Sequence, residues 1–422
     1  MFKKPMISIF SIAVTLSSTL NLVMPKMANH NRQVAFIAYL LGAELNFPLE
    51  KRKELFLAAV MHDIGAISQQ EKMDNMAFEV LNPHRHSEIG YRLLCQFPPF
   101  AAIADIVRFH HVRWADGEGI RFNGHDVSEA SHIIHFADRI AVMLPEQSRV
   151  LGAAKRIVEE IDKYRGSWFK PEFVDAFTNL AGREHFWLDA TAASPTETLL
   201  DIVNSDSVEF DIALLQGLSR IFAQIIDFRS SFTATHSAGV AASAEILAQL
   251  AGFSENELLM MRMAGHLHDL GKVTVPTSIL EKPGKLSTEE WDIMRAHTYH
   301  GFRTLQKIPI LETVNTWGSL HHEKLNGSGY PFHLTADELP LGSRIMAVAD
   351  IFAALTENRP YREGMQPKQA LQIISGMAKA GEIDTHLVAL LQENLKEIDA
   401  CRQAAVGQAT TDYWELFRVS NF

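Results

Sequence analysis

The strongest constraint in this sequence is an internal repeat of histidine and aspartate residues. Seven such residues in the first half recur in the second half at separations of 206 to 212 residues. The first-half residues are His30, His62, Asp63, His86, His110, His111 and Asp138. Their counterparts are His236, His268, Asp269, His297, His321, His322 and Asp350. Loop insertions between fixed positions explain the small changes of separation, so we expect one folding unit used twice.

The repeat organises the 422 residues into two domains, each long enough to bury a core. We expect a first domain over 1–190 and a second over 206–405. The linker is expected over 191–205, because small residues and a proline interrupt the apolar pattern there.

The residues before each His-Asp pair follow helical spacing. We expect these two helices to end at Gly65 and Gly271, each in a left-handed cap. Apart from short extended pieces such as Val273–Val275, no useful strand pattern is visible in the sequence. The sequence therefore predicts an all-α fold of two tandem helical domains.

The segment from Met6 to Met24 follows two lysines and contains many apolar residues, as export signals and membrane anchors do. Its apolar residues instead recur at helical spacing, at Ile9, Ile12, Leu16, Leu20 and Val23. We therefore expect the first helix of the first domain, with no membrane association. The two cysteines exclude a disulfide framework and a cysteine-ligated metal site, and they fit a reducing, cytoplasmic compartment.

The formal net charge of −11 excludes a protein that grips duplex nucleic acid through its overall field. A small anionic ligand held by a few local arginines remains compatible with this charge. A homodimer or contacts with signalling proteins are left open.

Histidines and aspartates repeated in this way indicate metal binding, because apolar residues fill a core better. A carboxylate has two oxygens, so Asp269 is assigned as a bridge between two divalent cations. One cation would take His236, His268 and Asp350, and the other would take His297, His321 and His322. Nitrogen and oxygen ligands without sulfur favour iron or manganese over zinc, cobalt or nickel. A hydroxide activated by two metals suits attack on phosphorus, so we predict phosphoester hydrolysis.

The second half resembles the HD-GYP family, a branch of the HD superfamily of metal-dependent phosphohydrolases. The stretches that carry the resemblance are HLHDLGK (266–272), ILEKPGKL (279–286), HHEKLNGSGYP (321–331), RIMAVAD (344–350) and RPYR (359–362). It implies a helical fold, the metal ligands assigned above, and a phosphodiesterase acting on a cyclic dinucleotide. The substrate would be cyclic di-GMP or 3′,3′-cyclic GMP-AMP, cleaved to the linear dinucleotide and in some members onward to mononucleotide.

The resemblance also implies roles for residues outside the ligand set. Lys272 would lie near the attacked phosphate, Arg359 and Arg362 would hold substrate phosphate, and Tyr330 would position the substrate. Two positions depart from relatives: Ala353 replaces a second aspartate, and Phe232 replaces a glutamate of members with three metals. We therefore expect a two-metal site.

The first half resembles an HD domain that lacks the signature, because Ala66 replaces the lysine and no Gly-Tyr-Pro follows His110 and His111. The seven retained ligands predict a further metal pair there. This domain could be a second phosphohydrolase, such as a nucleotidase, or could regulate its partner. The tandem layout also resembles bacterial phosphodiesterases for 3′,3′-cyclic GMP-AMP. The alternative from another class is a non-catalytic helical signalling or scaffold module.

Overall fold

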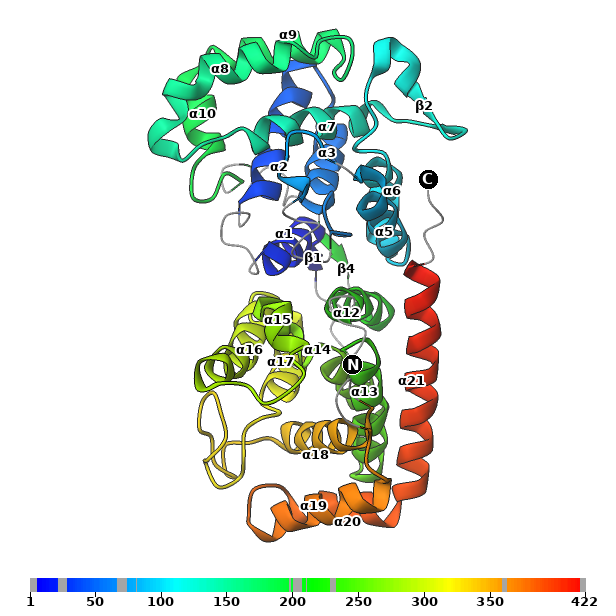
Figure 1. Cartoon of the computed structure of the whole chain (residues 1–422). Helices are drawn as coiled ribbons and strands as arrows, with labels where there is room; N and C mark the ends of the chain where they lie inside the picture. Colours follow the sequence, from blue (N-terminus) through cyan, green and yellow to red (C-terminus); the bar gives the residue numbers. More distant parts are fainter. Residues whose placement is uncertain are drawn as a thin grey trace. The chain divides into compact units, whose positions relative to one another are not determined.

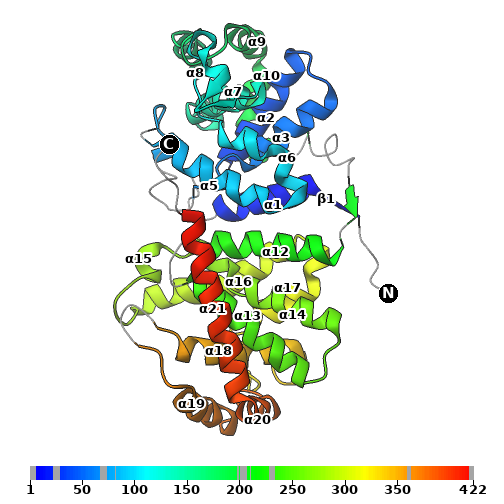
Figure 2. The same cartoon turned by 90° about the vertical axis from the view of Figure 1, so that its right-hand side faces the viewer.

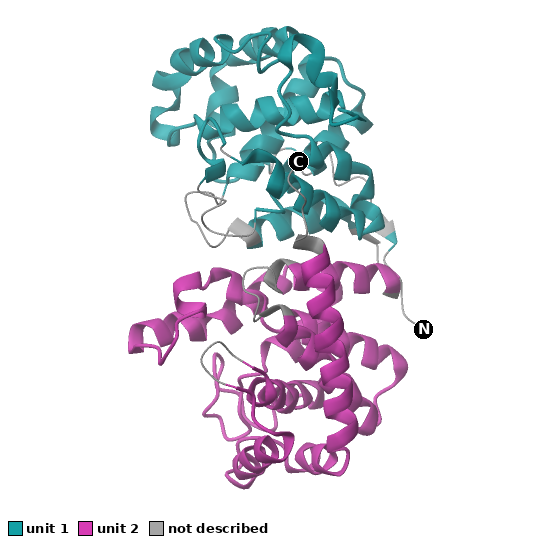
Figure 3. Cartoon of the chain, turned by 45° about the vertical axis from the view of Figure 1, so that its right-hand side comes forward, with its two compact units in different colours: residues 1–210, 418–422 teal, residues 211–417 magenta. Residues whose placement is uncertain are grey.

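The computed structural model describes residues 6–21, 29–66, 74–80, 82–196, 199, 207–209, 211–227, 233–358 and 363–417. The chain divides into two compact units, one of residues 1–210 with 418–422 and one of residues 211–417 (Figure 3). Helices dominate both units, which confirms the all-α prediction.

The first unit is built from α-helices and two short antiparallel strand pairs. Its helices are α1 (Ile9–Asn21), α2 (His30–Glu44), α3 (Leu49–Met61), α5 (Pro83–Cys95), α6 (Pro98–Arg108), α7 (Glu129–Val142), α8 (Val150–Asp162), α9 (Pro171–Ala181) and α10 (Glu184–Ala190), with 3₁₀ segments at Ala115–Ile120 and Gln147–Arg149. The strands pair as β1 (Met6–Ser8) with β4 (Ser207–Glu209) and β2 (Arg121–Phe122) with β3 (His125–Asp126). Asn123 and Gly124 between β2 and β3 have positive φ angles, as an Asn-Gly hairpin turn requires.

Helix α2 is central to the first unit and contacts α3, α7 and α9 (Figure 1). Helix α1 packs against α3 and buries Ile9, Ile12 and Leu16. These residues confirm the predicted apolar face, whereas the side chains of Leu20 and Val23 lie outside the described part. Within the described residues, no helix has the length and apolar character needed to cross a membrane.

The second unit consists of α12 (Ile212–Asp227), α13 (Thr233–Leu250), α14 (Glu255–Leu267), α15 (Thr277–Leu280), α16 (Thr288–Leu305), α17 (Glu312–Ser319), α18 (Leu341–Thr356), α19 (Pro367–Lys379), α20 (Thr385–Glu393) and α21 (Leu395–Phe417), with 3₁₀ segments at Leu270–Thr274 and Pro309–Leu311. Helix α13 is central here and contacts α14, α18 and the long α21, which runs beside it in Figures 1 and 2. It thus occupies the place that α2 has in the first unit.

The two glycines after the His-Asp pairs do not form left-handed caps, so that expectation was wrong. Neither has a positive φ angle. A Cβ atom on Gly271 would lie 1.8 Å from the carbonyl oxygen of His297, and one on Gly65 would lie 2.1 Å from that of His86. Glycine is needed because two ligand-bearing segments approach closely at each site. The expected extended piece at Val273–Val275 was also wrong in part, because the 3₁₀ segment runs to Thr274.

Candidate metal centres

The second unit brings all seven predicted ligands together. They are His236 on α13, His268 and Asp269 after α14, His297 on α16, His321 and His322 after α17, and Asp350 on α18. Within each of two clusters the ligand atoms lie within 4.8 Å of one another. One cluster is His236, His268 and Asp350, and the other is His297, His321 and His322. The sequence suggested the same division.

Asp269 lies between these clusters. Its Oδ2 is 3.2 Å from Nε2 of His268, and its Oδ1 is 3.3 Å from Nε2 of His297. Two atoms that bind one cation at about 2.0–2.2 Å each lie roughly 3 Å apart when they are neighbours in its coordination sphere. The two carboxylate oxygens therefore face different clusters, as a bridging ligand requires.

Three of the imidazole rings are oriented with Nε2 toward the site. Nδ1 of His268, His297 and His321 lies 2.8, 2.6 and 2.7 Å from the carbonyl oxygen of the residue three positions earlier. An Nδ1–H that donates to this carbonyl leaves the Nε2 lone pair for a cation. Nε2 of these three rings and Oδ1 of Asp269 are buried without a hydrogen bond. Buried polar atoms normally have partners, so these residues fit a bound metal.

The electrostatics around Asp269, His321 and His322 favour the forms of these residues that bind cations. Burial opposes ionisation of Asp269, but His268 and Lys272 outweigh it and hold the pKa of Asp269 well below its usual value. Burial lowers the pKa of His322 to about 3 and the pKa of His321 well below its usual value. The carboxylate is therefore ionised and these imidazoles are neutral near pH 7, as metal ligands must be.

Glu357 supports His236 from outside the ligand set, a role that the sequence reasoning missed. Its Oε2 lies 3.0 Å from Nδ1 of His236, while Nε2 of that ring is 3.2 Å from Oδ1 of Asp350. Burial lowers the pKa of His236, but hydrogen bonds to Asp350 and Glu357 outweigh it and raise the pKa to about 10. A carboxylate on the outer nitrogen of a metal-binding histidine fixes its orientation. The position of Glu357, seven residues after Asp350, offered only a weak sequence signal.

Lys272 and Tyr330 lie beside the ligand set. Nζ of Lys272 donates to Oδ2 of Asp269. The Tyr330 ring is 4.9 Å from the His322 ring, measured between centroids. Buried Glu323 accepts hydrogen bonds from the backbone N–H groups of Phe332 and Leu334, which fixes the loop that carries Tyr330.

Four further positions of the second unit were singled out from the sequence, and the structure describes one of them. Arg359 and Arg362, assigned to substrate phosphate, lie outside the described residues, as does Phe232. Ala353 is buried in α18, where a methyl group suits the packing.

The first unit arranges its seven predicted ligands in the same order of elements. They are His30 on α2, His62 and Asp63 after α3, His86 on α5, His110 and His111 after α6, and Asp138 on α7. Two clusters form, one of His30, His62 and Asp63 and one of His86, His110 and His111. Nε2 of His30 lies 3.1 Å from Oδ1 of Asp138. Asp138 therefore belongs with the first cluster.

Two rings of the first unit, those of His62 and His110, have the same orientation as their counterparts. Nδ1 of His62 and of His110 lies 2.7 and 2.6 Å from a carbonyl oxygen three residues earlier. Nε2 of His62 and Oδ2 of Asp63 are buried without a hydrogen bond. Burial opposes ionisation of Asp63, but His62 and His86 outweigh it and lower the pKa of Asp63 to about 2. These residues therefore also fit a bound metal.

Two residues that the sequence reasoning missed surround the carboxylates of the first unit. Nδ2 of Asn75 donates to Oδ1 of Asp63 at 2.9 Å. The buried Arg139 guanidinium donates to Oδ2 of Asp138 and to the carbonyl oxygens of Ala77 and Phe78. Arg139 follows a predicted ligand directly, but nothing in the sequence shows that its side chain turns back toward that carboxylate.

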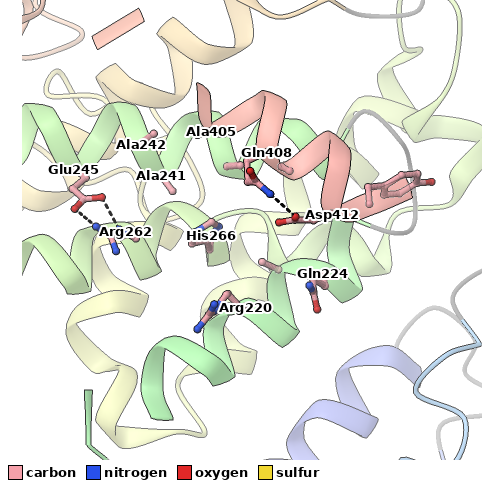
Figure 4. A pocket seen from close by; sticks show the side chains of 14 residues that line it. Arg220, Gln224, Ala241, Ala242, Glu245, Arg262, His266, Ala405, Gln408 and Asp412 are labelled. Atoms are coloured by element: carbon pink, nitrogen blue, oxygen red, sulfur yellow. Dashed lines mark hydrogen bonds and ion pairs between the residues drawn. The ribbon is translucent and has the colours of Figure 1, made fainter. Parts of the chain in front are cut away.

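A cavity of about 380 Å³ in the second unit lies apart from the ligand set. Residues of α12, α13, α14 and α21 line it, and none of the predicted site residues is among them. In Figure 4, Arg262 pairs with Glu245, and Gln408 donates to Asp412. His266 also lines this cavity and is not one of the seven predicted ligands.

Comparisons with known proteins bear on both units. Models of the HD domain match residues 27–143 and residues 220–387. The "3'3'-cGAMP-specific phosphodiesterase 1" of Vibrio cholerae is 27% identical over 396 residues, which are 91% of this chain and 90% of the relative. The "Cyclic di-GMP phosphodiesterase response regulator RpfG" of Xanthomonas campestris is 37% identical over 158 residues, which are 37% of this chain and 42% of the relative.

A solved structure shares the fold of the whole chain. It is a cyclic GMP-AMP-specific phosphodiesterase of V. cholerae, V-cGAP3, which superimposes with a TM-score of 0.62 at 22% identity. The superposition covers 93% of this chain and 98% of that one. The domain matches agree with the seven-residue repeat and with the two metal-ligand sets. The chain therefore belongs to the HD domain family, with two HD domains in tandem and the HD-GYP signature in the second.

Proposed function

We propose that the second unit is a metal-dependent phosphodiesterase that hydrolyses a cyclic dinucleotide to the linear dinucleotide. The observation that carries this proposal is the pair of ligand clusters joined by Asp269, with Lys272 beside it. Relatives that match this chain are named for 3′3′-cGAMP or cyclic di-GMP. Because the relative matched over both units is named for 3′3′-cGAMP, that substrate comes first, and cyclic di-GMP is the second candidate.

The residues of the site have distinct tasks in this reaction. Two divalent cations held here would lower the pKa of a bound water, so that hydroxide is available near neutral pH. The Asp269 carboxylate and the neutral imidazoles of His321 and His322 present their ligand atoms before substrate arrives. The ammonium group of Lys272 stabilises the negative charge that develops on the phosphate oxygens. Arg359 and Arg362 remain assigned to the other phosphate oxygens by resemblance.

For the metal we propose iron or manganese, because the ligand atoms are imidazole nitrogens and carboxylate oxygens without sulfur. The same argument supports a further metal pair in the first unit, whose ligand set has the same composition. A cytoplasmic location and a possible homodimer remain predictions from the sequence.

The test uses the whole protein loaded with manganese or ferrous iron. It is incubated with 3′,3′-cyclic GMP-AMP and with cyclic di-GMP, and the products are separated by chromatography. We expect the linear dinucleotide, with different initial rates for the two substrates. If neither cyclic dinucleotide is cleaved while metal analysis shows two cations bound in the second unit, the alternative of a non-catalytic signalling module is favoured.

A second candidate function concerns the first unit. A pocket of about 380 Å³ opens beside its ligand His111 and includes His84, Arg113, Arg121 and Phe122. Arginine side chains suit the phosphate of a nucleotide, and an aromatic ring suits its base. We therefore retain phosphohydrolysis of a nucleotide, such as the linear product, for this unit. The double variant His62→Ala with Asp63→Ala should then leave the linear product unprocessed, and unchanged processing would remove this candidate.

A further inference from the structure

An exposed tryptophan lies at the edge of the second metal-ligand set. Trp291 on α16 is 46% exposed, although indole side chains are usually covered. Its ring packs edge-on against Tyr330 of the signature loop, with 6.5 Å between the ring centroids. Tyr330 in turn lies against His322. The open face of Trp291 is therefore separated from a metal ligand by a single aromatic ring.

Arg295 lies one helical turn after Trp291 on the same face of α16. Its Cζ atom is 5.1 Å from the centroid of the Tyr330 ring, a cation–π contact. Among the described residues its carboxylate contact is Asp292, at the long distance of 4.0 Å. The guanidinium thus rests on Tyr330 while its N–H donors remain available to a ligand.

The placement of both residues is coupled to the metal-ligand set. Helix α16 also carries His297, two residues after Arg295, and that ring is held by the carbonyl oxygen of Met294. The helix that fixes a metal ligand therefore also fixes Trp291 and Arg295. If a molecule bound at the metal-ligand set carries an aromatic group that extends beyond it, that group can contact Trp291 and Arg295.

We propose that Trp291 and Arg295 bind one purine base of the substrate. The base stacks on the exposed indole, and the Arg295 fork donates to the O6 and N7 acceptors of a guanine. The inference rests on the proposed hydrolysis of a cyclic dinucleotide, because that substrate holds a base next to the phosphate. Tyr330 then supports Arg295 from below, which gives the signature tyrosine a defined positioning task.

The equivalent positions of the first unit, both within the described residues, lack this pair of side chains. At the separation of 211 residues that relates His86 to His297, Val80 stands in place of Trp291 and His84 in place of Arg295. Neither provides an exposed indole or a guanidinium fork. A base-binding surface of this kind therefore belongs to the second unit.

The test compares Trp291→Ala and Trp291→Phe in the full, metal-loaded chain with the matched control Trp414→Ala. Trp414 is 60% exposed on α21 and is not part of the metal-ligand set. Loss of a stacked base should raise the KM of Trp291→Ala for 3′,3′-cyclic GMP-AMP about tenfold, with a smaller rise for Trp291→Phe. We expect unchanged kcat and metal content in both, and no change of KM in Trp414→Ala. Calorimetric binding of the cyclic dinucleotide to the metal-free protein should weaken by a similar factor.

Arg295→Lys tests the recognition of guanine, because lysine keeps the charge but loses the fork. Binding of cyclic di-GMP to metal-free protein should weaken about tenfold, whereas binding of cyclic di-AMP should change little. Equal losses for both ligands would overturn guanine recognition by Arg295. Wild-type KM and binding in both Trp291 variants would overturn the stacking role while leaving hydrolysis established. A wild-type protein that neither binds nor cleaves any cyclic dinucleotide would overturn the proposed function and this inference together.

Discussion

The two metal-ligand sets share their ligands but differ in what surrounds the carboxylates. In the second unit, partly exposed Lys272 contacts Asp269, and Glu357 contacts Nδ1 of His236. In the first unit, buried Asn75 contacts Asp63, and buried Arg139 contacts Asp138. The predicted ligand His322 has a side chain that is 31% exposed, whereas its counterpart His111 is buried.

This difference shows that the helices that place the predicted ligands can be kept while the residues that contact those ligands change. The shared order of elements places seven ligand atoms in both units, because α2 and α13 hold equivalent central positions. The groups that contact those ligands come from loops and helix ends, which differ between the halves. The second set therefore combines the accessible His322 with the ammonium group of Lys272 near Asp269. In the first set, the buried guanidinium of Arg139 is held beside Asp138.

The largest effect should come from removing the bridging carboxylate of each unit in turn. Asp269→Ala should lower the rate of cyclic dinucleotide hydrolysis on the order of a thousandfold or more and release the metals of the second unit, because the hydroxide source is lost. Asp63→Ala should release only the metals of the first unit. Initial rates and metal analysis of both variants check this. Intact turnover in Asp269→Ala would show that the site is misplaced, and loss of turnover in Asp63→Ala would show that the units depend on each other.

An intermediate effect should come from removing the buried guanidinium of Arg139 in the first unit. Arg139→Leu leaves the Asp138 carboxylate buried without its partner, so the free energy of unfolding should fall by about 3–5 kcal/mol. Thermal unfolding measures this loss, and added Mn²⁺ should recover part of it by binding the folded form. The control Arg121→Leu breaks an exposed pair with Asp126 and should cost about 0–1 kcal/mol. Failure of Mn²⁺ to stabilise the first unit of either protein would argue against a metal there.

The smallest effect should come from Glu357, which touches no metal directly. Glu357→Gln keeps the size of the side chain but weakens its hold on Nδ1 of His236, so metal affinity should fall about 10–100-fold. Excess Mn²⁺ should restore most of the hydrolysis rate in this variant. Metal titrations should show no change in the control Glu338→Gln, whose carboxylate caps an exposed turn at Thr335. An unchanged metal affinity in Glu357→Gln would mean that Asp350 alone orients His236.

Much of the site was predictable because it follows from a repeat. The ligand pairs keep their separation along the chain, and helical spacing indicated which elements carry them. The contacts of Asn75, Arg139 and Glu357 were not predictable, since each depends on the direction that a side chain takes in the folded unit. Gly65 and Gly271 illustrate the same limit. Their positions after the His-Asp pairs suggested left-handed caps, whereas the structure shows that glycine is needed because two backbones approach closely.

The sequence alone determined that this chain is helical, that one unit is used twice, and which residue types form each ligand set. These properties are local, because they depend on periodicity and on the chemistry of histidine and aspartate. Only the tertiary structure decided that Asp269 faces two clusters and that the Nε2 atoms converge without partners. It also placed an exposed Trp291 beside the signature loop. Such properties depend on directions and distances between helices, which the packing of the core fixes and no single segment encodes.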